Sequence, residues 1–277
     1  MRLVVESYAE PNSLLPVVRL RQTLPLKEAY LSDGMTAAGG ATVRVGADTS
    51  WYDYMMESAG VYTPGADHTV APRTELRLEA SWQGQQVSAT TRVPPVVALE
   101  SADVTVGDHP VSGLILDSLF IDPSQIDTIR FDSLRTGASE GYVYLVEVTM
   151  RWQVDFAEEG PDSEYWVRTQ LRPDIDGRTK LDDYFLRPEQ LLREASIARD
   201  PMGWRIWTGV YAVPVEAANS PLPAHRLRAA LMRGTQAYAQ FVSGSGNPRH
   251  REPLTNIAGG LGIFAGVSVD SISVRVE

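Results

Sequence analysis

Alternating hydrophobic and polar positions run through most of the chain and predict β-strands. Short runs with a period of two occur at residues 3–8, 16–23, 41–45, 75–82 and 86–93. Within 75–82, Leu76, Leu78 and Ala80 face one side, while Arg77 and Glu79 face water. A strand with one apolar side needs a second layer to cover it. The pattern therefore predicts a small antiparallel β-sandwich of immunoglobulin-like or transthyretin-like shape.

Turn residues support this interpretation and suggest where the first domain ends. Gly84 lies between the last two predicted strands, at 75–82 and 86–93, and suits a hairpin. Pro94 and Pro95 then remove two backbone donors in succession, which favours an extended connection over a central strand. We therefore predict an N-terminal β-sandwich domain at residues 1–95 and a second, β-rich domain at residues 96–277.

The second domain also begins with alternating segments. The clearest is 142–156, where every second residue from Tyr142 to Phe156 is apolar. Further strands are predicted at 165–172 and at 204–215, and the latter is apolar on both sides near its middle, as in the centre of a sheet. The last predicted strands, 257–269 and 272–276, are interrupted by glycine.

Two segments of this domain are predicted as helices. The first is 187–199, because Pro188 suits a first turn and Leu191, Leu192 and Ala195 have helical spacing. The second lies near 221–242, with Ser220 as its cap. Its apolar stripe consists of Leu227, Leu231, Tyr238 and Phe241. The expected fold class is mainly β, with two β-sandwich-like domains and one or two helices packed on the second sheet.

Composition excludes several classes of partner and site. The chain has 35 acidic and 25 basic residues, a formal net charge of -10, so its field repels phosphate backbones and nucleic acid is not expected as a partner. It has no cysteine, which excludes disulfides, thiolate metal sites and cysteine nucleophiles. No apolar run is long enough to predict a membrane-spanning helix.

The residues that usually carry catalysis show no recognisable arrangement. The histidines His68, His109, His225 and His250 are scattered, without metal-ligand spacing, and each is predicted to have a structural role at the surface. Neither a Gly-x-Ser-x-Gly elbow nor a phosphate-binding loop is present. We therefore predict a protein that is not an enzyme, with no catalytic residue and no cofactor.

One acidic segment resembles the start of a calcium loop. Asp174 and Asp176 alternate and are followed by Gly177, so their oxygens could surround a hard cation. The later carboxylate is missing from its usual position, although Asp182 and Asp183 lie close by. A polar turn is the preferred interpretation, with Asp174 and Asp176 as the metal candidates.

Two aromatic groups could form stacking surfaces. One comprises Trp51, Tyr52 and Tyr54, and the other Tyr165 and Trp166. Such rings can bind a sugar or a peptide. They equally suit packing across a sheet, which is the interpretation we prefer.

Several segments together resemble a known family. The segments 3–8, 17–23 with Pro25, 40–45 and 88–94 are similar to the amino-terminal half of the family called domain of unknown function 4249. Gln236-Ala-Tyr238, the step Glu252-Pro253 and the run Asn-Ile-Ala-Gly-Gly-Leu-Gly-Ile-Phe at 256–264 resemble the end of that family. Together these segments cover nearly the whole chain.

This resemblance implies an exported lipoprotein of the Gram-negative outer membrane, often encoded beside a TonB-dependent receptor, with no established catalytic activity. Family members usually carry a signal peptide and a lipid-bearing cysteine before the first strand. The present sequence shows neither, so we expect its start to be trimmed or shortened, with membrane attachment only through that missing lipid anchor. The expected location is the cell envelope.

The motif residues at the carboxyl end have expected structural roles. Gly259, Gly260 and Gly262 would permit bulges or close backbone approach, Phe264 would fill a core, and Asn256 would cap a turn.

The predicted function is a non-catalytic binding or accessory protein of the cell envelope that works with a TonB-dependent receptor in nutrient uptake. A structural or adhesive surface module without a small ligand is the alternative, and a hydrolase acting on glycans or peptides is the third hypothesis. No ligand-binding residue is predicted from the sequence.

Overall fold

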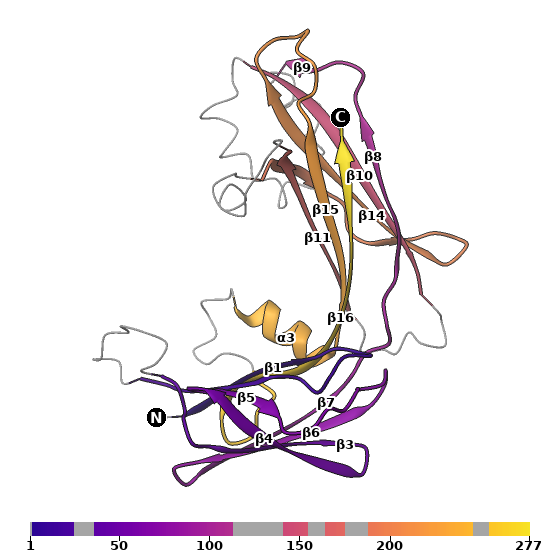
Figure 1. The fold of residues 1–277 in the computed structure, drawn as a ribbon. Coiled ribbons are helices and arrows are strands. Elements are labelled where there is room, and N and C mark those ends of the chain that lie inside the picture. Colours follow the sequence, from indigo (N-terminus) through magenta and orange to yellow (C-terminus); the bar gives the residue numbers. More distant parts are fainter. Residues whose placement is uncertain (1, 25–35, 113–140, 155–163, 175–187, 246–254) are drawn as a thin grey trace. The chain divides into compact units, whose positions relative to one another are not determined.

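The computed structural model describes residues 2–24, 36–112, 141–154, 164–174, 188–245 and 255–277 (Figure 1). In these ranges the protein is mainly β, with strands in two sheets and one helix. The predicted mainly β fold, with sandwich-like sheets and a packed helix, is confirmed.

Two compact units make up the chain. The first comprises residues 1–97, 156–166 and 232–269, and the second comprises residues 98–155, 167–231 and 270–277. The first unit thus combines the N-terminal strands with a late stretch of the chain. Three strands, β11 (Glu164–Pro173), β15 (His225–Gly234) and β16 (Leu261–Val276), contribute residues to both units.

The first unit is built on one long series of strands. They are β1 (Leu3–Ala9), β2 (Val18–Gln22), β3 (Thr42–Ala47), β4 (Ser50–Ser58), β5 (Val61–Pro64), β6 (Glu75–Trp82) and β7 (Gln85–Arg92). The hydrogen-bonded order of the sheet is β11-β15-β16-β1-β2-β5-β4-β3-β6-β7. β1 pairs in parallel with β16, whereas β2 to β7 pair antiparallel with their neighbours. Each strand run predicted in the first ninety residues is present, and β4 and β5 are additional.

The apolar sides of these strands form one core. On β6, Leu76 and Leu78 are fully buried, as the alternation predicts, and on the paired strand β3 Val43 and Val45 are buried beside them. The predicted hairpin between β6 and β7 is also present. Its two turn residues, Gln83 and Gly84, have φ angles of 47° and 80° and connect the paired Trp82 and Gln85. Positive φ at both positions matches the twist of a two-residue hairpin.

The helix α3 (Gln236–Ser245) belongs to the first unit, not to the second sheet on which a helix was expected, and packs through aromatic side chains. Tyr238 meets Tyr8 of β1 edge-on at a centroid distance of 6.0 Å, and Trp166 at 5.2 Å. Gly234, just before the helix, leaves room for this cluster, because a Cβ there would lie 2.8 Å from both Trp166 and Tyr238. Figure 1 shows α3 beside β1, away from β3 and β6.

The second unit contains a separate sheet. Its strands are β8 (Leu99–Val106), β9 (Val111–Ser112), β10 (Tyr142–Gln153), β12 (Gln190–Glu194), β13 (Ala198–Arg199) and β14 (Trp204–Val215). The order is β12-β14-β10-β8, with β13 paired to β14 and β9 to β10. The central position predicted for 204–215 is confirmed. On β10 the predicted apolar side is buried, with Val146, Val148, Met150 and Trp152 at 0% exposure, whereas Phe156 lies outside the described residues.

The helix predicted near 221–242 is wrong over its first part. Residues 225–234 form strand β15, in which Leu227, Ala229 and Leu231 are all fully buried. A spacing of four residues brings side chains to one face of a helix, but it does the same in a strand, where every second residue shares a side. Ala229, midway between Leu227 and Leu231, distinguishes a strand from a helix. In a strand it shares the buried side of the two leucines, whereas in a helix it would lie on another side. Only the end of the expected helix, from Gln236, is helical.

The helix predicted at 187–199 is also wrong. Among residues 188–199, the structure has β12 and β13, which both pair with β14. The register of β12 shifts between Leu191 and Arg193, so Leu192 is an extra residue and turns inward, at 8% exposure. Such a bulge interrupts the alternation of a strand. Because the bulge breaks the alternation at Leu191 and Leu192, the sequence of this strand resembles the pattern of a helix.

Candidate functional site

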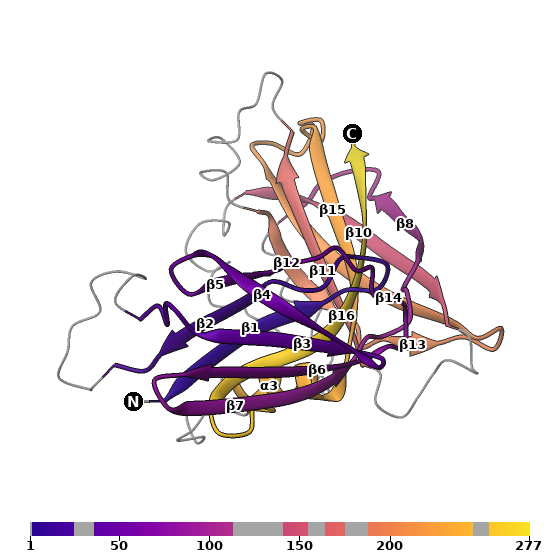
Figure 2. The same ribbon diagram turned by 60° about the horizontal axis from the view of Figure 1, so that its bottom comes forward.

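Four neighbouring strands of the first unit, β4, β3, β6 and β7, turn one side outward (Figure 2). The register places Asp53, Arg44, Glu79 and Ser88 in one row across the strands. A second row contains Thr42, Ser81 and Gln86. We call this surface the polar face, and it consists of Thr42, Arg44, Trp51, Asp53, Arg77, Glu79, Ser81, Gln86 and Ser88.

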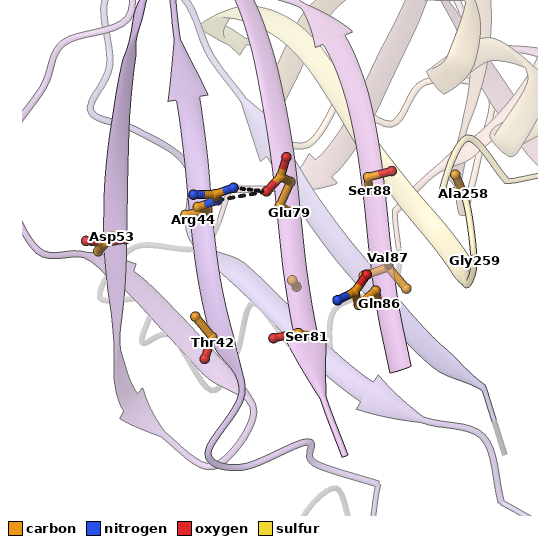
Figure 3. A pocket seen from close by; sticks show the side chains of 11 residues that line it. Thr42, Arg44, Asp53, Glu79, Ser81, Gln86, Val87, Ser88, Ala258 and Gly259 are labelled. Carbon is orange, nitrogen blue, oxygen red and sulfur yellow. Dashed lines mark hydrogen bonds and ion pairs between the residues drawn. The ribbon is translucent and has the colours of Figure 1, made fainter. Parts of the chain in front are cut away.

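The polar face is hollowed into a shallow cavity of about 700 Å³ (Figure 3). Most of the polar face lines it, and Ala258 and Gly259 close its far side next to β7. Ser88 and Ala258 exchange two backbone hydrogen bonds of 3.1 and 2.8 Å, which continue the sheet beyond β7. A rigid ladder of strands therefore holds the side chains of this cavity in place.

An ion pair occupies the middle of the cavity. The guanidinium of Arg44 donates to Glu79 Oε2 from Nε at 2.7 Å and from Nη2 as well (Figure 3). The side chains are 47% and 45% exposed, and a pair this exposed contributes at most about 1 kcal/mol to stability. The pair therefore orients two charged groups toward solvent more than it stabilises the fold.

Trp51 lies flat on the sheet beside this pair. Its indole covers Gly46 of β3, where a Cβ would lie 3.3 Å from three ring atoms. The guanidinium carbons of Arg44 and Arg77 lie 4.5 and 5.3 Å from the ring centroid, a cation–π arrangement. Arg77 also donates to the carbonyl of Asp48 at 3.0 Å. Trp51 thus fixes two cations on the polar face.

The predicted aromatic group at 51–54 is divided between the two sides of the sheet. Trp51 is 38% exposed on the polar face, whereas Tyr54 is 8% exposed in the core, and its hydroxyl donates to the carbonyl of Pro16 at 2.9 Å. Burial raises the pKa of Tyr54. Tyr52 stacks on His68, with its hydroxyl 2.8 Å from Nδ1. Packing therefore explains two of these three rings, and Trp51 remains available for recognition.

The polar face was not predicted as a site. Its charged residues stand at every second position of strands, where solvated residues are normal. What brings them together is the pairing register, which a single strand does not reveal.

The motif at the carboxyl end ties β16 to the preceding loop. The side-chain amide of Asn256 donates from Nδ2 to the Phe264 carbonyl at 2.7 Å, and its Oδ1 accepts from the Phe264 N–H at 3.0 Å. Thr255 donates to the Gly262 carbonyl at 2.8 Å. Phe264 itself is fully buried in the core. The side-chain amide of Asn256 therefore pairs with the backbone of Phe264 in the way that the backbone of a neighbouring strand would.

Three glycines of this motif allow close backbone contact. Gly262 has a φ of 100°, and a Cβ there would lie 1.9 Å from the Val5 carbonyl oxygen of β1. At Gly259, with a φ of 76°, the corresponding distance to the Gln86 carbonyl oxygen is 2.4 Å, and at Gly260 a Cβ would lie 2.7 Å from the carbonyl of Leu3. These positions are structural, and Gly259 also borders the cavity.

Asp174, one of the two metal candidates, is held by arginines. Its carboxylate accepts from Arg226 Nη2 at 3.0 Å and lies 3.8 Å from Arg275 Nε. Asp176 lies outside the described residues. Within the described ranges, no group of three or more histidine or carboxylate side chains is arranged to hold a metal ion.

His225 is buried, so the surface role predicted for it is wrong. Its side chain is 2% exposed, its Nε2 lies 3.0 Å from Glu189 Oε1, and its Nδ1 lies 2.6 Å from the Pro223 carbonyl. Burial lowers the pKa of His225, but the hydrogen bonds to Glu189 and Pro223 and the charges of Glu189 and Asp174 outweigh it and raise the pKa. His109 is exposed, and His250 lies outside the described residues.

The helix in the described ranges, α3, is not long and apolar enough to cross a membrane. No curated protein sequence matches the chain. The family model described as domain of unknown function 4249 matches residues 1–186, which include the whole polar face but not the motif at 256–264. Because this match covers more than half of the 277 residues, the protein belongs to the domain of unknown function 4249 family.

Proposed function

We propose that this protein is a non-catalytic binding or accessory protein of the cell envelope, and that the polar face is its recognition surface. The observation that carries the proposal is the cavity on the polar face. Thr42, Asp53, Ser81, Gln86 and Ser88 line it, and no side-chain hydrogen bond engages them among the described residues. Polar groups that are exposed, positioned by a sheet and left without intramolecular partners are suited to binding.

The expected partner is a TonB-dependent receptor of the outer membrane, in keeping with the family resemblance noted from the sequence. In this proposal, the protein is attached outside the cytoplasm and contributes to nutrient uptake. A net charge of -10 would give the complex a charge-dependent association rate.

Co-purification tests the proposal. The full-length natural protein, tagged and extracted from membranes in mild detergent, is expected to bring down an outer-membrane receptor. The double variant Asp53→Asn/Gln86→Ala on the polar face is expected to bring down much less. Glu147→Gln/Gln153→Ala, at exposed positions of β10, is the matched control and should behave like the wild type. Recovery of no receptor with wild-type protein, or equal recovery with both variants, would count against the proposal.

A further inference from the structure

The polar face has the hydrogen-bonding chemistry of a sugar site, and we propose that it binds a neutral oligosaccharide. This inference rests on the proposed function, which it extends by naming the class of ligand.

The groups in the cavity both donate and accept. Thr42, Ser81 and Ser88 supply hydroxyls, Gln86 an amide, and Asp53 a carboxylate, from four different strands (Figure 3). Each hydroxyl of a sugar likewise donates one hydrogen bond and accepts others. The cavity of about 700 Å³ lies within the usual size of a small-ligand site, so a short oligosaccharide fits it.

The charges of the polar face cancel. Arg44 is paired with Glu79, and the remaining carboxylate of Asp53 is balanced by Arg77 on the same face. A strongly anionic ligand would meet no excess of positive charge here, and its approach to a chain of net charge -10 would be unfavourable. A polycation would find no uncompensated cluster of acids. Charge balance therefore favours an uncharged ligand.

An extended peptide is disfavoured because the backbone groups of these strands are already used. β3 is paired with β4 and β6, and β6 with β3 and β7, so strand addition cannot occur in the middle of the face. Val87, the largest apolar residue of the cavity lining, is only 3% exposed, so it offers little surface to an anchoring apolar side chain. The polar side chains of the lining are therefore the main groups that can hold a ligand in the cavity.

Trp51 adds an aromatic ring to the hydrogen-bonding groups of the cavity. It is 38% exposed and lies next to Arg44, outside the cavity lining, so the part of its indole that Gly46, Arg44 and Arg77 leave uncovered can contact the C–H groups of a sugar that extends beyond the cavity. Arg44 itself can donate to sugar hydroxyls while it keeps its bond to Glu79, since a guanidinium has five N–H groups.

A glycan array tests the inference directly. The full chain is applied to immobilised malto-, cello-, xylo- and manno-oligosaccharides, with oligogalacturonides as acidic probes, and any binding is then measured by titration calorimetry. We expect at least one neutral oligosaccharide to bind. Its affinity should fall at least tenfold in Asp53→Asn/Gln86→Ala and remain unchanged in Glu147→Gln/Gln153→Ala. A second variant, Arg44→Gln, covers the case in which the double variant fails to fold, and the same loss is expected from it.

The inference is overturned if no neutral oligosaccharide binds, if only the oligogalacturonides bind, or if the polar-face variants bind as well as the wild type. Failure of the inference can be separated from failure of the proposed function. A receptor that co-purifies with wild-type protein but not with Asp53→Asn/Gln86→Ala, together with an empty array, would retain the recognition surface and reject the sugar.

Discussion

His225 should make the stability of the second unit depend on pH. The carbonyl of Pro223 and the carboxylate of Glu189 lie against its two ring nitrogens, at 2.6 and 3.0 Å. Both oxygens can only accept hydrogen bonds, and a neutral imidazole has a single N–H. Loss of the proton would therefore leave one ring nitrogen with its lone pair facing an oxygen and without a hydrogen bond. The folded state therefore favours the imidazolium, even though burial alone lowers the pKa of His225.

The direction of the effect follows from the raised pKa. The folded protein binds the His225 proton more tightly than the unfolded chain, whose histidine pKa is about 6.5. The stabilisation is complete below that pH and is lost as the pH rises through the pKa of the folded state. At most one proton is involved, so the free energy of unfolding should fall by no more than about 1.4 kcal/mol per pH unit in this window.

The substitution Glu189→Gln tests this pH dependence of stability. The change removes the charge that accepts from the buried imidazolium, and a hydrogen bond to a charged group is worth about 1.5–3 kcal/mol. Because glutamine keeps an acceptor oxygen, we expect the variant to lose at most about that much stability at pH 6 and much less at pH 9. The difference between the two proteins should therefore shrink as the pH rises.

Urea unfolding of wild type, Glu189→Gln and the control Glu147→Gln, from pH 5.5 to 9, measures this difference. The other histidines are common to all three proteins, so their titration cancels in the comparison. NMR of the His225 ring nitrogens gives a second readout, with both nitrogens protonated in the wild type at pH 6. Parallel stability curves for wild type and Glu189→Gln, or a neutral ring at pH 6, would refute the reasoning.

Two further predictions concern the motif at the carboxyl end. Asn256→Leu removes both hydrogen bonds to the Phe264 backbone and should cost about 2–3 kcal/mol, measured as a lower urea midpoint; an unchanged midpoint would contradict a structural role for the amide. Gly262→Ala places a methyl group 1.9 Å from the Val5 carbonyl oxygen and should prevent folding or lower the melting temperature severely. Gly84→Ala, with a φ of 80° and open space around it, is the control and should cost only about 1–2 kcal/mol.

Much of the fold could be predicted because strand alternation depends only on which residues are buried. The alternation on β6 and β10 was sufficient to identify both strands and their buried sides. It was insufficient at β15, where Leu227 and Leu231 satisfy both periods, and at β12, where a bulge places Leu192 out of step. These errors arise from local geometry that pairing with a neighbouring strand decides.

The candidate site was harder to predict than the fold. Arg44, Asp53 and Glu79 lie on three strands and come together only through the β3–β4 and β3–β6 registers. No signal in the sequence separates them from ordinary solvated strand positions. His225 was misjudged for a related reason, because its partner Glu189 is distant in the sequence and only the fold brings the two together.

The inner side of β3 and β6 determines the fold, whereas the outer side carries the proposed binding surface. Val43, Val45, Leu76 and Leu78 on the inner side fix the register, since a slip of one residue would turn every one of them to solvent. The same register aligns the side chains of the polar face without any contribution from them, and the exposed Arg44–Glu79 pair adds little stability. Substitutions on the polar face should therefore change binding while the fold persists. Closely similar urea midpoints for Asp53→Asn/Gln86→Ala and the wild type would establish that separation, whereas a large loss of stability would show that the polar face takes part in holding the sheet together.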